Sequence, residues 1–122
     1  MSREGNQQEG FNRVIVIGEV SSTPVSRDLA DGNVVTTFDV VSHTEAGRVS
    51  VPISVDGIPS FLEEGMSVCV TGFVRRRFFK AGASVASRTE VVANVIAPTR
   101  RKAQVRKALE SMADDLSELL DA

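Results

Sequence analysis

Residues 60–65 read Ser-Phe-Leu-Glu-Glu-Gly, and this stretch decides the fold class. Ser60 is a typical helix N-cap, Glu63 stands where it completes a capping box, and Gly65 suits the end of a helix. The stretch therefore predicts one short helical turn. Directly before it, Asp56-Gly57-Ile58-Pro59 interrupts a β-type segment, so we expect the turn to separate two groups of strands.

Five β-type segments surround this turn, three before it and two after it. Each is rich in β-branched residues or alternates apolar with polar ones, as strands do. The segments cover residues 11–20, 33–42, 48–55, 66–79 and 83–96. The short glycine-containing links at residues 45–47 and 80–82 predict two hairpins, one on each side of the helical turn.

This order of elements predicts an all-β fold, a five-stranded Greek-key barrel of the OB type with the short helical turn between its third and fourth strands. A five-stranded sandwich is the alternative, and the position of the helical turn argues against it. A chain of 122 residues is long enough for one such domain. We expect the barrel to span residues 11–99, after a polar leader at residues 1–10 that we expect to be disordered.

The period of the apolar residues changes after the barrel. From Gln104 to Leu120 they recur at steps of four and three, which predicts an amphipathic C-terminal helix after a basic linker, together residues 100–122. The apolar positions are Val105, Leu109, Met112, Leu116 and Leu119. With fewer than three heptads, the helix must dock on the barrel, pair with another copy or fray.

Charge is segregated along the chain. The net charge of −2 argues against a protein that binds nucleic acid through bulk positive charge. Residues 11–99 carry eight Lys and Arg against nine Asp and Glu, so a nucleic-acid site there must be a local patch. The C-terminal region begins with a basic block consisting of Arg100, Arg101, Lys102, Arg106 and Lys107. Acidic residues without cations among them follow, namely Glu110, Asp114, Asp115, Glu118 and Asp121.

Residues 75–80, Arg-Arg-Arg-Phe-Phe-Lys, form the densest mixture of cations and aromatics in the chain. Cations neutralise phosphates and an aromatic face stacks on any base, so this mixture suits a nucleic-acid single strand. On a strand, Arg75, Arg77 and Phe79 share one face. We therefore interpret Phe79 as a stacking residue and Phe78 as part of the barrel core. The alternative is an edge hairpin whose arginines are solvated and block aggregation.

The candidate nucleic-acid-binding residues combine this stretch with cations of the other strands. They are Arg13, Arg48, Arg75, Arg77, Phe79, Lys80 and Arg88.

The residue types needed for catalysis or metal binding are not grouped in the sequence. His43 is the single histidine, and no repeating pair of carboxylates accompanies it. Cys69 is the single cysteine, which excludes an internal disulfide and fits a reducing compartment. No apolar run approaches membrane-spanning length. We expect a cytoplasmic protein that is not an enzyme and uses no cofactor or metal.

Six motifs along residues 11–96 have the order and spacing of one known family. They lie at residues 12–20 (NRVIVIGEV), 23–27 (TPVSR), 35–38 (VTTF), 61–68 (FLEEGMSV), 70–75 (VTGFVR) and 89–95 (TEVVANV). Together they resemble the bacterial single-stranded DNA-binding protein family. In that family the segment that corresponds to residues 23–27 is a turn. The resemblance implies an OB-fold that binds single-stranded DNA in replication, repair or recombination, associated with the nucleoid.

The chain departs from the family where the family stacks bases. It contains no Trp and no Tyr, and of the family's aromatic positions it keeps only Phe79. Val49 and Val55 stand at the aromatic positions of the third strand, and the loops between strands two and three and between strands four and five are short. The family's long Gly-rich tail with its acidic end is absent as well.

Two functional classes remain. The first is a compact member of the family that binds single-stranded DNA, with RNA as the other candidate ligand. The second is an OB-fold assembly protein, similar to a primosome accessory, that has weak or no DNA binding and recruits a replication or repair protein through its C-terminal helix. Affinity for oligo-dT that falls steeply with salt distinguishes the first from the second.

We also expect a homo-oligomer, because the first strand is apolar on both faces. The resemblance implies dimers built on this strand and tetramers made from two dimers. The predicted interface residues are Val14, Val16, Ile15 and Ile17.

Overall fold

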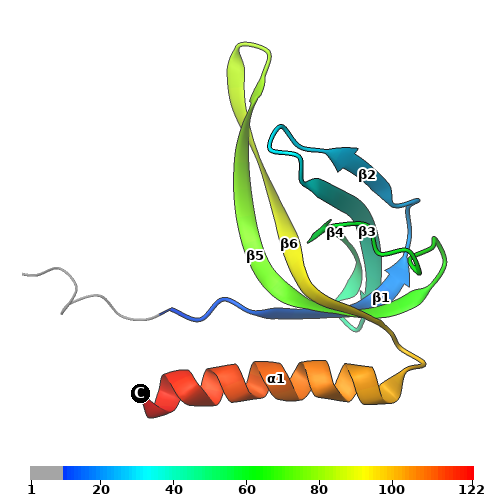
Figure 1. Cartoon of the computed structure of the whole chain (residues 1–122), viewed down its shortest axis with the longest axis vertical. Coiled ribbons are helices and arrows are strands. Elements are labelled where there is room, and N and C mark those ends of the chain that lie inside the picture. The colour runs from blue at the N-terminus through cyan, green and yellow to red at the C-terminus, as the bar shows by residue number, and fades with distance from the viewer. Residues whose placement is uncertain (1–9) are drawn as a thin grey trace, which may run out of the picture.

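The computed structural model describes residues 10–122, so the predicted leader lies outside the described residues except for Gly10. In this part of the chain six strands are followed by one helix (Figure 1). The elements are β1 Val14–Val20, β2 Val25–Asp28, β3 Val34–Thr44, β4 Gly47–Asp56, β5 Ser67–Ala81, β6 Ser84–Pro98 and α1 Lys102–Asp121.

The strands form a closed barrel. Their order is β1-β5-β6-β4-β3-β2, and β1 also pairs with β3 to close the ring. Both β1 and β2 pair with β3, at Val20↔Val40 and Val25↔Thr37, so they act as two pieces of one barrel strand. The β4–β6 contact is parallel, and the other pairs are antiparallel. The predicted all-β fold, a five-stranded OB-type barrel with a C-terminal helix, is confirmed.

Two local features differ from expectation. Residues 25–28 form a strand where the resemblance implied a turn. Between β4 and β5 the predicted helical turn is present only as two single turns, closed by Leu62 N–H to Pro59 C=O at 3.1 Å and Met66 N–H to Glu63 C=O at 3.3 Å. The N–H of Gly65 donates to the carbonyl of Val20 at 2.8 Å, so the segment is tied to β1 and does not continue a helical ladder.

The barrel interior is a compact aliphatic core with one aromatic ring. Alternate residues of the strands point inward, as the period of two requires, and Leu62 closes the core from the β4–β5 link. The buried members are Val16, Val20, Phe38, Val40, Ile53, Leu62, Val68, Val70, Val91 and Ala93.

The β5–β6 hairpin extends well beyond the barrel (Figure 1). Its register runs from Arg75↔Glu90 to Ala81↔Ser84. We call this projecting part, residues 75–90, the arm. Its residues are exposed except for Ala86, which is half-buried, and Glu90, which is buried, so barrel packing does not hold the side chains of the arm.

The helix α1 lies across the base of the barrel (Figure 1), against β5 and β6. Ala108 is buried on its docked face, and Arg13 forms an ion pair with Asp115 at 2.6 Å. Cys69 and Thr71 point away from the core but are only 1% and 2% exposed, because α1 covers this side of β5. The sequence allowed the helix to dock on the barrel, to pair with another copy or to fray, and in the structure it docks on the barrel. In residues 10–122 no helix is long and apolar enough to cross a membrane.

Candidate nucleic-acid interface

A cleft of about 180 Å³ opens on the outer surface where the arm meets the barrel. We call it the arm cleft. It combines three arginines, two hydroxyls, one carboxylate and three apolar side chains. The lining residues are Arg27, Arg75, Arg77, Thr37, Ser54, Asp56, Leu29, Val35 and Val92. The cleft is therefore cationic on balance, with apolar surface between its polar groups.

One buried carboxylate holds two of these arginines in place. Nε and Nη2 of Arg75 donate to Oε2 of Glu90 at 3.1 and 2.6 Å. Nε of Arg77 lies 3.2 Å from the same oxygen. The side chain of Glu90 is 3% exposed, whereas each arginine side chain is 42% exposed. The two guanidiniums therefore share one negative charge and still present donors to solvent.

One face of the arm includes Arg75 and Arg77 and therefore borders the arm cleft. We call it the groove face, and it carries the predicted cation–aromatic set. Residues directly opposite in an antiparallel ladder point to the same side, and the register pairs Arg77 with Arg88 and Phe79 with Ala86. Phe79 is 47% exposed. The structure thus brings together Arg75, Arg77, Phe79 and Arg88.

The opposite face of the arm corrects one expectation and separates another residue from the set. Phe78 is 67% exposed and does not belong to the barrel core, because the barrel ends before the arm reaches this residue. The guanidinium of Arg76 lies 5.6 Å from the Phe78 ring centre, within cation–π range. Lys80 alternates with Phe79 and therefore lies on this opposite face, away from the groove face.

Arg13 and Arg48 lie apart from the arm cleft. Arg13 is paired with Asp115 beneath the barrel. Arg48 stands opposite His43 near the tip of the β3–β4 hairpin and lines a separate cleft of about 370 Å³ that also contains Glu19. The predicted set of cations is therefore divided among three parts of the surface.

The predicted oligomer interface also needs correction. Val16 belongs to the buried core, and Val14 packs against that core, so neither side chain is available to a second copy. Ile15 and Ile17 are 45% and 51% exposed because they point to the outer side of β1. The strand therefore has one free apolar face.

Arg27 is the arginine of the arm cleft that is missing from the predicted set. It lies in β2, opposite Val35 of β3. Residues 25–28, Val-Ser-Arg-Asp, show no apolar–polar alternation and are all exposed, so the sequence carried no local signal for this strand, and the segment matched a turn motif.

The loop from β2 to β3 lies next to the arm cleft and has a defined conformation. The backbone N–H of Asn33 donates to Oδ1 of Asp31 at 3.0 Å, and its side-chain amide donates to Oδ2 at 2.9 Å. These two hydrogen bonds lower the pKa of Asp31 from its ordinary value. Asp31 therefore keeps its negative charge in mildly acidic solution.

A metal site is not formed by the described residues. Within residues 10–122, no three His, Cys, Asp or Glu side chains come close enough together to hold a metal ion. Burial raises the pKa of the Cys69 thiol, which disfavours the reactive thiolate.

No protein-family model matches the sequence, and no curated protein does. Among solved structures, one described as a Plasmodium falciparum SSB complex with ssDNA is similar to this chain. The two superpose with a TM-score of 0.65 at 19% sequence identity, over 75% of this chain and 97% of the other. At this identity the likeness shows a shared fold, the closed OB-type barrel.

Proposed function

We propose that this protein binds single-stranded DNA through the arm cleft and the groove face of the arm. The observation that carries the proposal is the position of the cationic cleft. It lies on the β3–β4 surface, beside the β2–β3 loop and the β5–β6 hairpin, and OB-folds bind oligonucleotides in this region. The similar solved structure, described as a complex with ssDNA, supports the same ligand.

The side chains of this surface make two kinds of contact with the strand, with its phosphates and with its bases. Arg27, Arg75, Arg77 and Arg88 contact phosphates, and Phe79 stacks on a base. Since cations and an aromatic face read no base edge, binding is not sequence-specific, and RNA is the other candidate ligand. Stacking contributes about 1–3 kcal/mol per base, and this face presents one aromatic ring, so we expect weak binding per protomer.

The biological setting follows from this ligand. We propose a short, divergent relative of the bacterial single-stranded DNA-binding proteins that acts in replication, repair or recombination in the cytoplasm, associated with the nucleoid. It is not an enzyme under this proposal. A dimer or tetramer assembles through the free apolar face formed by Ile15 and Ile17. Such an oligomer places several weak sites on one DNA strand, and the sites together bind with higher avidity than one site alone.

A salt titration with fluorescent oligo-dT tests the proposal. The affinity falls with a slope set by the number of phosphate contacts, about 0.7 per contact for single strands. Arg88→Ala, on the groove face, lowers the slope by about that amount. Arg76→Ala, on the opposite face of the same arm, is the matched control and leaves it unchanged. Absence of salt-dependent binding by the unmodified protein overturns the proposal.

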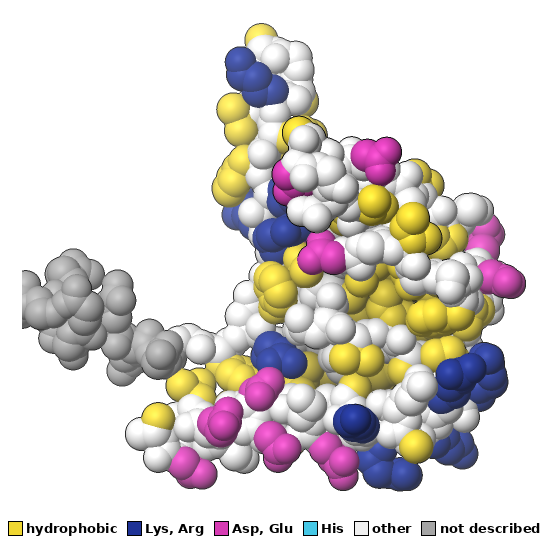
Figure 2. Space-filling view, viewed as in Figure 1, with side chains coloured by type: hydrophobic (Ala, Val, Ile, Leu, Met, Phe, Trp, Pro, Cys, Tyr) yellow, Lys and Arg dark blue, Asp and Glu magenta, His cyan; other side chains and the backbone are white. Residues whose placement is uncertain are grey.

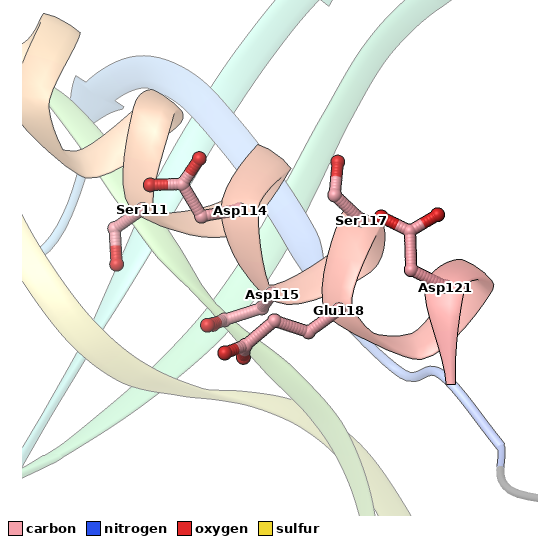
Figure 3. Close-up of a pocket in the computed structure, with 6 residues that line it drawn as sticks. All are labelled: Ser111, Asp114, Asp115, Ser117, Glu118 and Asp121. Carbon is pink, nitrogen blue, oxygen red and sulfur yellow. The ribbon is translucent and has the colours of Figure 1, made fainter.

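The acidic surface of α1 favours the assembly role as a second candidate. The exposed surface of the C-terminal half of the helix is mainly acidic, and it also includes the exposed apolar residues Leu116 and Leu120. Figure 3 shows the carboxylates there, including those of Asp114, Glu118 and Asp121. A replication or repair protein with a basic surface is the partner that matches. This role predicts no oligo-dT affinity at any salt concentration.

A further inference from the structure

A second cleft, of about 330 Å³, lies where β6 passes into α1. We call it the junction cleft. Its lining combines apolar residues of the barrel with polar residues at the start of the helix. The lining residues are Phe61, Met66, Ile96, Pro98, Arg100, Arg101 and Gln104. No acidic residue is among them, so the cleft is apolar at its floor and cationic at its rim.

Positive charge is concentrated around this rim. Arg100 and Arg101 belong to the basic block that continues through Lys107, and the first turn of α1 carries no acidic residue. In the part of the chain described, ion pairs form at Arg13, Arg75 and Arg77, and none forms in the basic block. Figure 2 shows a dark blue cluster at this end of the helix, whereas magenta groups follow its other half.

The junction cleft also presents an aromatic face. Phe61 is 43% exposed, although its neighbour Leu62 is buried in the core. The burial of Leu62 fixes the backbone that carries Phe61, so the ring is held at the surface by a well-packed residue. An exposed aromatic ring beside arginines also distinguishes the groove face of the arm, although Arg75 and Arg77 there are paired with Glu90.

We propose that the junction cleft and the basic block form a second nucleic-acid contact surface, on which Phe61 stacks a base and the cations of residues 100–107 follow the phosphates. This inference rests on the proposed function. An acidic peptide would use the cations at the cleft, but the positive charge continues beyond it through the first two turns of α1, at Lys102, Arg106 and Lys107. A polyanion with a charge at every nucleotide matches this length of surface.

The positions of the two surfaces determine what the second one does. The arm and the start of α1 lie at opposite ends of the molecule (Figure 1). A short oligonucleotide therefore occupies one surface at a time, whereas a long strand crosses the barrel and reaches both. The second surface lengthens the binding site and steepens the salt dependence only for long strands.

The experiment compares two lengths of oligo-dT. One has about 6 nucleotides and the other about 30, inside and beyond the roughly 4–16 nucleotides covered by one OB-fold. The variant Arg100→Ala/Arg101→Ala/Lys102→Ala reduces the salt slope for the long strand by about 2, with a much smaller change for the short one. Arg100→Lys/Arg101→Lys keeps the charge and leaves both slopes unchanged.

A second pair of variants tests the stacking role. Phe61→Leu keeps an apolar side chain but removes the aromatic face, and it weakens binding of the long strand by about 5- to 150-fold at constant salt slope. Phe11→Leu is the matched control, because Phe11 is similarly exposed, at 40%, and lies outside the junction cleft.

Equal changes for the two lengths, or no change for either, overturn the second surface while leaving the arm cleft as the binding site. Failure of the unmodified protein to bind either length overturns the proposed function itself.

Discussion

Arg75 donates two hydrogen bonds to a single oxygen of Glu90, from Nε at 3.1 Å and from Nη2 at 2.6 Å. Arg77 approaches the same oxygen. A buried carboxylate thus neutralises one of the two positive charges that Arg75 and Arg77 bring to a cleft that we propose for phosphates. Glu90 positions both guanidiniums and at the same time reduces their attraction for an anion.

Replacing Glu90 with Gln separates these two effects. Glu90→Gln removes the negative charge with little change in volume, so we expect tighter oligo-dT binding and a steeper salt dependence. The same change lowers stability by about 1–3 kcal/mol, because a buried charge-assisted hydrogen-bond partner is lost. Fluorescence anisotropy and thermal unfolding measure the two effects. Weaker binding by Glu90→Gln at unchanged stability would show that positioning outweighs charge.

The two adjacent phenylalanines of the arm give the next prediction. Phe79→Ala lowers oligo-dT affinity by about 1–3 kcal/mol without changing the salt slope, because stacking releases no counterions. Phe78→Ala, on the opposite face, is the matched control for binding. Since Phe78 is 67% exposed, we expect its removal to change stability by no more than about 0.5 kcal/mol. A large loss of thermal stability in Phe78→Ala would contradict the exposed position of this ring.

The docking of α1 is tested through the thiol that it covers. Ala108 is buried, so Ala108→Arg forces the helix away from β5 and β6 and lowers stability by about 1–3 kcal/mol. Cys69 then becomes exposed, and its raised pKa returns toward the ordinary value. The rate of reaction with a thiol reagent at mildly alkaline pH therefore increases. Ala113→Arg, on the exposed side of the same helix, is the control and leaves Cys69 protected.

Gly72 marks the point where β5 shifts register against β6. A Cβ atom at this position would overlap the carbonyl oxygen of Val92, and a backbone oxygen in a sheet has little freedom to move. We expect Gly72→Ala to destabilise the protein by about 3 kcal/mol or more. Gly10→Ala, where a Cβ meets no atom within 4 Å, is the control in the same denaturant titration.

The barrel was predictable because its signals are local. Strand alternation, short glycine-containing links and the 3.6-residue period of α1 are each set by neighbouring residues. The period of two also predicts which residues share a face of the arm. It places Arg75, Arg77 and Phe79 on one face and Phe78 and Lys80 on the other. These features do not depend on the placement of distant segments.

The errors arose where distant segments decide the outcome. Phe78 looked like a core residue because its strand is apolar further back, and nothing in the sequence shows where the barrel ends along β5. The two faces of β1 looked alike, but only the side with Val14 and Val16 meets the interior. The contact of Arg13 with nucleic acid stays a prediction, and its ion pair with Asp115 was invisible in the sequence because the two residues are 102 positions apart.

That ion pair has a consequence for how the chain folds. Arg13 immediately precedes β1, whereas Asp115 lies in the last two turns of α1, so the contact closes a loop that includes nearly the whole domain. Non-local closures of this kind slow folding, because chain entropy is lost before the contacts form. During synthesis on the ribosome, β1 can complete its pairing only after β5 has been made. The Arg13–Asp115 ion pair on the outer side of β1 forms only after α1 has emerged.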